Sequence, residues 1–254
     1  MRAIWIISTL TLREAIRNKI LYLLFFFALF LVFSSWVIGQ LTIGDQLKII
    51  KDMGISSIHF FGVLIAIFIG IGLIFRELDK RTVYLVLSKP LRRYQFLMGK
   101  FLGLAVTLLV VLCGLVLMFY LLLLLKSESS PKILLVFYPI YLEWLLIAGI
   151  ALLFSSFSTP LLSGMLTLGS FVCGHLSRSL LLLNSRFHSD ISGAVISGIF
   201  YLIPDLELFN IRTQVVHGLG VSLPFVTETT LYWIAYESAL LLIAIYIFET
   251  KDLV

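Results

Sequence analysis

Long apolar stretches, separated by short polar segments, dominate the pattern along the chain. At a rise of ~1.5 Å per residue, a helix of about 20 residues crosses a ~30 Å hydrocarbon core, and six stretches are of that order. The six predicted spans are Ile20–Gln40, Ile58–Phe75, Phe101–Leu125, Ile133–Phe157, Leu161–Leu183 and Thr229–Phe248. The pattern therefore predicts an all-α integral membrane protein with one transmembrane domain over residues 1–254.

Two of the polar segments between these spans are long enough to need separate interpretation. Residues 42–57 carry four charged side chains and are predicted to form a short polar connection. Residues 184–228 are irregular, and their one apolar stretch, Ile191–Ile203, is too short to cross a membrane alone and ends at Pro204. We expect this stretch to be an outer helix that either dips into the membrane or lies flat on its far face.

The first 19 residues mix polar and apolar positions at helical spacing. At ~100° per residue, Arg13 and Arg17 lie on one side, whereas Ile7 and Ala15 lie roughly opposite. This predicts an amphipathic helix in the plane of the membrane interface, with its basic side toward the lipid headgroups. The basic residues predicted at the interface, here and before the third span, are Arg13, Arg17, Lys19, Arg92 and Arg93.

A charged block, Arg76–Lys100, separates the second and third spans. It holds seven of the nineteen Lys and Arg residues, whereas the spans on either side carry no charged residue. Because Lys and Arg are enriched in cytoplasmic loops, the block is predicted on the cytoplasmic face, and six spans put both termini there too. Within the block, Pro90 ends a short helical stretch, and Gly99 and Gly103 allow another backbone to approach the third span closely.

Composition excludes a soluble globular protein, because 60% of the residues are hydrophobic and the mean hydropathy is +1.08. The net charge of +5 is segregated rather than spread. The expected partner of the basic surface is therefore the lipid of an anionic inner leaflet and not nucleic acid. Cys113 and Cys173 both lie in apolar spans, where they are expected to pack as small hydrophobic residues.

No motif for enzymatic chemistry occurs in the sequence. It contains no G-x-x-x-x-G-K-[S/T] to cradle a nucleoside triphosphate, and no H-E-x-x-H, G-x-S-x-G or C-x-x-C. The four histidines lack the spacing of metal ligands; they are His59, His175, His188 and His217. The sequence therefore predicts no catalytic residue, no metal site and no cofactor bound by this chain.

Ionisable residues inside the predicted spans are the candidate functional residues. Glu143 lies near the middle of the fourth span, Glu237 at a similar depth in the sixth, and His175 and Arg178 in the outer half of the fifth. A charge in lipid costs at least ~2.5 kcal/mol on insertion scales, so such groups usually face the bundle interior. Three interpretations stay open: a translocation path or gate, a structural pair such as Glu143 with Arg178, or a neutral protonated carboxyl bonded to a neighbouring helix.

The charged block also carries a longer pattern, E-x-x-x-x-T-x-x-x-x-L-S-K-P-L-x-R-x-x-F-L-x-G-K, which begins at Glu77 and ends at Lys100. It resembles the first cytoplasmic loop of ATP-binding-cassette type-2 permeases. The opening Thr11–Lys19 resembles the amphipathic N-terminal helix of that family, and Phe248–Leu253 resembles its short C-terminal motif. Pro204–Asn210 is similar to the outer segment of the branch that includes the nitrous-oxide-reductase maturation permease.

This resemblance implies a dimer of six-span subunits, with the type V exporter fold, driven by two separate P-loop ATPase subunits. ATP and Mg²⁺ would be bound by those subunits, and the second permease subunit would complete a homodimer or a heterodimer. In that family, a coupling helix in the first cytoplasmic loop docks on the ATPase. The residues implied in or beside that helix are Glu77, Asp79, Lys80, Arg81, Thr82 and Tyr84.

The expected function is export of a substrate across the bacterial inner membrane, with ATP hydrolysed by another chain. The short loops leave no room for a large outer domain, so any delivery in the periplasm requires another protein. One alternative is a membrane assembly or structural protein without transport. A secondary carrier would need discontinuous spans and paired repeats, which are not evident, and an intramembrane enzyme would need a nucleophile or metal set.

Overall fold

The computed structural model describes residues 2–41, 45–79, 93–126, 131–184, 203–216 and 221–250. Within these ranges the chain is built of helices and contains no strand, as the sequence predicts. The long helices are α1 (Arg2–Ile16), α2 (Lys19–Leu41), α3 (Gln46–Asp79), α5 (Arg93–Leu124), α6 (Phe137–Phe157), α7 (Pro160–Asn184) and α10 (Leu223–Thr250). Short elements in the same ranges are η1 (Pro131–Val136), η2 (Leu206–Phe209) and α9 (Arg212–Val216).

Five stretches of the described helices are long and apolar enough to cross a membrane. They are Lys19–Leu41, Gln46–Leu73, Arg93–Leu124, Ile133–Phe157 and Pro224–Thr250. They coincide with the first four predicted spans and the sixth. The predicted fifth span is helical as part of α7, and its crossing of the membrane stays a prediction.

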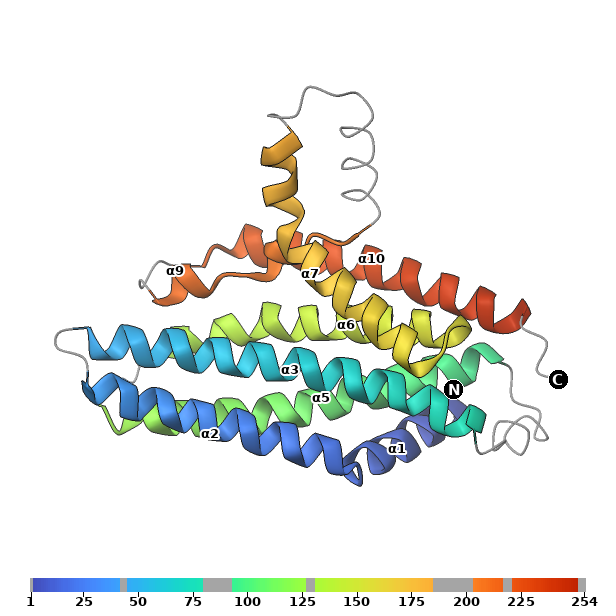
Figure 1. Ribbon diagram of the computed structural model, residues 1–254, viewed down its shortest axis with the longest axis horizontal. Helices are drawn as coiled ribbons and strands as arrows, with labels where there is room; N and C mark the ends of the chain where they lie inside the picture. The colour runs from blue at the N-terminus through green and yellow to red at the C-terminus, as the bar shows by residue number, and fades with distance from the viewer. Residues whose placement is uncertain are drawn as a thin grey trace.

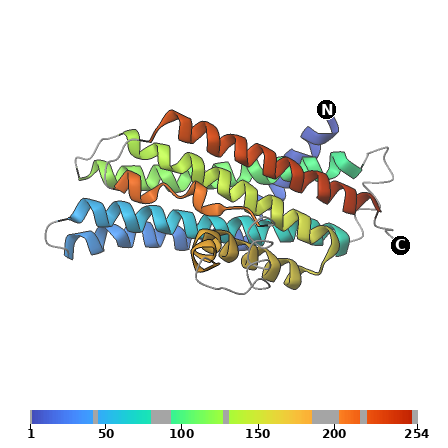
Figure 2. The ribbon, with the colours of Figure 1, turned by 90° about the horizontal axis from the view of Figure 1, so that it is seen from above.

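The long helices run roughly side by side along the long axis of the molecule (Figure 1). The start of α1, the end of α3, the start of α5 and the end of α10 lie at one end, as both views show (Figures 1 and 2). The end of α2, the start of α3 and the short helix α9 lie toward the other end. Helix α7 crosses the bundle obliquely, and its last part turns away from the other helices (Figure 1).

The predicted polar connection over residues 42–57 is wrong for most of its length, because α3 already begins at Gln46. Ile50 and Ile55 in this segment are fully buried, and Ile50 packs against Gly39 of α2. The apolar positions therefore continue the buried side of α3, while Lys48 stays outside and pairs with Asp45 at 3.1 Å. With 34 residues, α3 is about 51 Å long and extends beyond a ~30 Å hydrocarbon core.

Helix α6 forms the centre of the bundle, and glycines on α3 let large side chains close the packing around it. Trp144 of α6 fills the space beside Gly62, where any Cβ would collide with the indole ring. Phe119 of α5 fills the equivalent space beside Gly54. Both aromatic side chains are fully buried, so the interior of the bundle is packed without gaps at these positions.

Helix α1 packs on the first turns of α5, which begins at Arg93 inside the charged block. Gly99 lies against Ile7, and Gly103 lies against Thr11 and the carbonyl of Ser8. The predicted close approach at the two glycines is therefore confirmed. Asn18 lies between α1 and α2 and caps α2, accepting a hydrogen bond from the backbone N–H of Ile20 at 3.1 Å.

The apolar side predicted for the N-terminal helix is its packed side, since Ile7 and Ala15 are buried. Arg13, Arg17 and Lys19 are exposed, as the predicted basic side requires. The position of α1 in a membrane interface stays a prediction.

Two predicted segments fall largely outside the described residues. The first is the part of the charged block over residues 80–92, and the second is the outer apolar stretch over residues 191–202.

Candidate functional site

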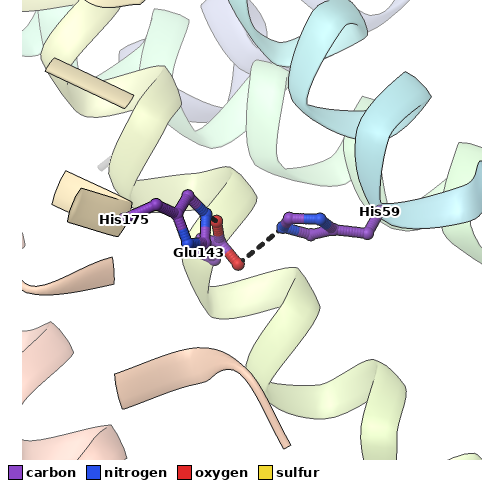
Figure 3. Close-up of side chains that lie close together, drawn as sticks. All are labelled: His59, Glu143 and His175. Atoms are coloured by element: carbon purple, nitrogen blue, oxygen red, sulfur yellow. Dashed lines mark hydrogen bonds and ion pairs between the residues drawn. The ribbon is translucent and has the colours of Figure 1, made fainter. Parts of the chain in front are cut away.

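Glu143, in the buried middle of α6, joins three helices. Its side chain is 1% exposed. Oε2 lies 2.8 Å from Nε2 of His59 on α3, and Oε1 lies 2.9 Å from Nε2 of His175 on α7 (Figure 3). Each carboxylate oxygen therefore has its own imidazole partner, and the pair of contacts ties α3 and α7 to the central helix.

The position of His59 follows from the packing of α3 on α6. Gly62 lies three residues after His59, on the adjacent turn, and Trp144 directly follows Glu143. Because Gly62 has no side chain, Trp144 can sit against the backbone of α3 there. This close approach brings the imidazole of His59 within hydrogen-bond distance of the carboxylate.

The position of His175 is fixed by groups on both of its sides. Phe171, one turn earlier on α7, meets the imidazole edge-on with ring centroids 4.8 Å apart. On the far side, Nδ1 of His175 lies 3.3 Å from Oε2 of Glu207 in η2. Asn210 donates a hydrogen bond of 2.9 Å to the other oxygen of Glu207. The imidazole is therefore held between two carboxylates.

The segment that carries Glu207 is itself anchored to α7 and α10. Asp205 caps η2 by accepting from the backbone N–H of Glu207 at 3.1 Å, and Ser177 Oγ lies 3.2 Å from the same Asp205 oxygen. The N–H of Asp205 donates to the hydroxyl of Tyr232 at 2.8 Å. Gly174 leaves room for Leu206 to pack directly on α7.

Three contacts of the two imidazoles with carboxylates require three protons. His59 makes one such contact and His175 makes two, one from each ring nitrogen. Two neutral imidazoles carry only one ring proton each, which is enough for two of the three contacts. The third contact needs one additional proton or another positive charge. A proton on an imidazole or on a carboxyl can supply it, and so can a bound cation.

A cavity of about 400 Å³ opens beside these residues. His59, Glu143 and His175 line it together with apolar side chains of α3, η1, α6 and α7, and with residues 209–212. Arg212 lies at the cavity and contacts Asp52 at 3.1 Å and the hydroxyl of Ser56, which are both on α3. The site therefore combines a few polar side chains, of which Glu143 is buried, with a largely apolar lining, which is the usual form of a small-ligand site.

Glu237, the second carboxyl predicted inside a span, has a different environment. It is 3% exposed, and neither oxygen has a hydrogen-bond partner among the described residues. The carboxyl lies directly against Gly149 of α6, where a Cβ would collide with it. Glu237 is thus separate from the His59–Glu143–His175 cluster and unpaired within the part of the chain that the structure describes.

The other predicted site residues lie partly inside and partly outside the described ranges. Arg93 donates from Nη1 to the carbonyls of Phe248 and Glu249 at the end of α10, both at 3.0 Å. Arg92, Lys80, Arg81, Thr82 and Tyr84 lie outside the described residues. Glu77 and Asp79 belong to the last turns of α3, and Arg178 belongs to α7, but their side chains are outside the described part. The suggested pair of Glu143 with Arg178 therefore stays a prediction.

His59 was not predicted as a site residue, and the grouping of two histidines with Glu143 was not predicted either. The partners are 84 and 32 residues apart in sequence, so no local spacing reveals them. One available signal was that His59 lies, like Glu143 and His175, inside a predicted apolar span. Polar groups inside spans usually face the bundle interior and pair with one another. This preference alone would have favoured placing His59, Glu143 and His175 together.

Comparison with known proteins identifies a family for nearly the whole chain. The family model described as "ABC-2 family transporter protein" matches residues 5–253. No curated protein matches the chain. The match does not distinguish branches of the family, so the similarity of Pro204–Asn210 to the nitrous-oxide-reductase maturation branch stays a prediction.

Proposed function

The chain belongs to the ABC-2 family of transporter membrane proteins, and from this premise we propose that it exports a substrate with energy from two separate ATPase subunits. As a member of this family it is a membrane component of an ABC transporter. In the proposal, the ATPase subunits bind ATP and Mg²⁺ and dock at the charged block. The docking residues are Glu77, Asp79, Lys80, Arg81, Thr82 and Tyr84.

The observation that carries this proposal is the way both ends of the charged block are joined to the bundle. On one side the block continues from α3, which is helical to Asp79. On the other side Arg93 begins α5 and caps the last carbonyls of α10, and Phe96 stacks on Phe248 with ring centroids 5.8 Å apart. The last carbonyls of a helix have no partner within the helix, so a guanidinium there fills this role by donating hydrogen bonds to them. Its positive charge also interacts favourably with the negative end of the helix dipole.

A third helix joins the same end of the bundle. Lys100, nearly fully buried, lies 3.3 Å from the carboxylate of Glu14 on α1. Gly99 and Gly103 bring α1 into direct backbone contact with α5 on either side of this pair. A displacement of the charged block would therefore move α1, α3, α5 and α10 together.

Helix α3 supplies the route from the block to the interior of the bundle. From Asp79 to His59 the helix is continuous, and twenty residues correspond to about 30 Å. A rigid helix of this length converts a shift at its end into a shift at the cavity, in the manner of rigid-body switches. In the proposal, closure of the ATPase subunits moves the end of α3 and so changes the cavity beside Glu143.

The remaining parts of the proposal concern topology and assembly. The end of the bundle that carries the charged block and both termini would face the cytoplasm of a bacterial cell, and the end with α9 would face outward. A second permease subunit, identical or different, would complete the transporter. Because the described outer segments are short, handover of a substrate in the periplasm would involve another protein.

Purification from native membranes tests the assembly. The tagged chain should retain a P-loop ATPase, identified by mass spectrometry, and the reconstituted complex should show ATPase activity that depends on the permease. Charge reversal at Glu77, Asp79, Lys80 and Arg81 should release the ATPase or abolish this stimulation. The matched control is charge reversal of the exposed pair Asp45 and Lys48, at the other end of α3, which should leave both unchanged. Absence of any P-loop ATPase, or normal coupling in the block variants, would overturn the proposal.

A further inference from the structure

We propose that His59, Glu143 and His175 form a binding site for one divalent first-row transition-metal ion of the zinc class. The three side chains come from α3, α6 and α7 and each directs a ligand atom toward the others (Figure 3). These three atoms lie within 4.8 Å of one another. This proposal concerns ion binding in the bundle and does not depend on the coupling to an ATPase.

Two of the distances within the cluster are close to those that a tetrahedral ion requires. Bonds of about 2.0–2.2 Å from imidazole nitrogen and carboxylate oxygen place neighbouring ligand atoms about 3.3 Å apart. The Nε2 atoms of His59 and His175 now lie 2.8 and 2.9 Å from the oxygens of Glu143. To hold a zinc-sized ion, these two contacts have to open by a few tenths of an ångström. Ligand atoms that now lie up to 4.8 Å apart have to draw together by as much as about 1.5 Å, through rotation of the side chains.

A supporting contact of the kind found at metal centres is already in place. Metal-bound histidines usually donate their other ring N–H to a carboxylate or carbonyl, which fixes the tautomer and the ring orientation. Nδ1 of His175 lies 3.3 Å from Glu207, and Glu207 is held in turn by Asn210. With the proton of His175 on Nδ1, its Nε2 lone pair faces Glu143 and the centre of the site.

The ligand set selects the class of ion. Two imidazoles with one carboxylate suit Zn²⁺, Fe²⁺, Co²⁺, Ni²⁺ and Cu²⁺, whereas Mg²⁺ and Ca²⁺ take oxygen ligands. Burial supports a cation, because a carboxylate that is 1% exposed needs positive charge beside it. The three ligands also line the cavity of about 400 Å³, so a fourth coordination position can be filled from that side.

The test is a titration of the full-length chain in lipid nanodiscs, purified with a tag that contains no histidine. Zn²⁺ should bind with a stoichiometry of one per chain and raise the thermal midpoint of unfolding, and Mg²⁺ at the same concentration should do neither. Glu143→Gln, His59→Asn and His175→Asn should each abolish stoichiometric binding. Glu207→Gln should weaken it about 10–100-fold, as expected for a supporting residue. The control Glu237→Gln, a buried carboxyl outside the cluster, should bind Zn²⁺ like the wild type.

A second variant keeps the proposal testable if the substitutions prevent folding. His59→Cys replaces one ligand by another that transition metals accept, and Co²⁺ added to this variant should give a thiolate charge-transfer band in the near ultraviolet. The wild type with Co²⁺ should show only the weak visible bands of a nitrogen and oxygen site. No stoichiometric Zn²⁺ binding by the folded wild type would overturn the proposal. Binding unchanged by Glu143→Gln, or no charge-transfer band in folded His59→Cys, would do so too.

Discussion

The indole ring of Trp144 occupies the space beside Gly62, and this contact holds α3 against α6 where His59 meets Glu143. A Cβ at Gly62 would collide with three atoms of the indole. Trp144 is fully buried. The packing of Trp144 against Gly62 therefore sets the distance between His59 and Glu143.

Gly62→Ala should destabilise the protein, because the added methyl group forces α3 away from α6. We expect a loss of about 1–3 kcal/mol in the free energy of unfolding, as for overpacked cores. Chemical denaturation in detergent micelles measures it. Gly169→Ala is the matched control: a Cβ there meets nothing within 4 Å, so the change should be neutral or stabilising by up to ~1 kcal/mol. Equal stability of the two variants would contradict this account of the interface.

Replacing the buried carboxyls of Glu143 and Glu237 by apolar side chains should change the stability of the protein in opposite directions. Glu143→Met leaves the two histidines without their partner and should cost about 1–3 kcal/mol of unfolding free energy. Glu237→Met loses no hydrogen bond within the described residues and should gain about 1 kcal/mol, because an unpaired buried polar group is removed. The same denaturation assay compares them. A loss of stability in Glu237→Met would indicate a partner for that carboxyl outside the described residues.

Arg93→Gln should impair the coupling between the permease and its ATPase more than it impairs folding. The substitution removes the cap on the carbonyls of Phe248 and Glu249, a partly exposed contact worth about 0.3–1 kcal/mol. We expect near-normal amounts of folded protein and a clear loss of permease-dependent ATPase activity in the reconstituted complex. Lys48→Gln, which removes the exposed ion pair with Asp45 at the other end of the bundle, is the control and should keep that activity. Full permease-dependent ATPase activity in Arg93→Gln would argue against the idea that movement of the charged block is passed to the bundle through α5 and α10.

Cysteine labelling should place the two ends of the bundle on opposite sides of the membrane. In a chain whose Cys113 and Cys173 are replaced by alanine, a cysteine at Ser88 in the charged block should react with a membrane-impermeant maleimide only after the cells are opened. A cysteine at Lys126, which lies beside Gln46 at the other end, should react in intact spheroplasts. The reverse pattern would contradict the proposed cytoplasmic position of the block.

The sequence predicted the helices better than their ends. Apolar stretches of span length are a local property, so the spans over Ile20–Gln40 and Ile133–Phe157 coincide closely with described helices. The start of α3 was missed because the charged residues in 46–57 are typical of a loop, although Ile50 and Gly54, one helical turn apart, are both buried. Tertiary packing against α2 decides that this segment is helical.

Composition and the order of apolar stretches along the chain determined that it is a membrane protein and where five candidate spans fall. These follow from transfer of each stretch between water and lipid, which depends on local residues alone. The meeting of His59, Glu143 and His175 was decided by the tertiary structure. Helices that are apolar all round carry no periodic signal of which side faces protein. Contacts such as Gly62 with Trp144 select that side, and they turn three separate polar residues toward one point.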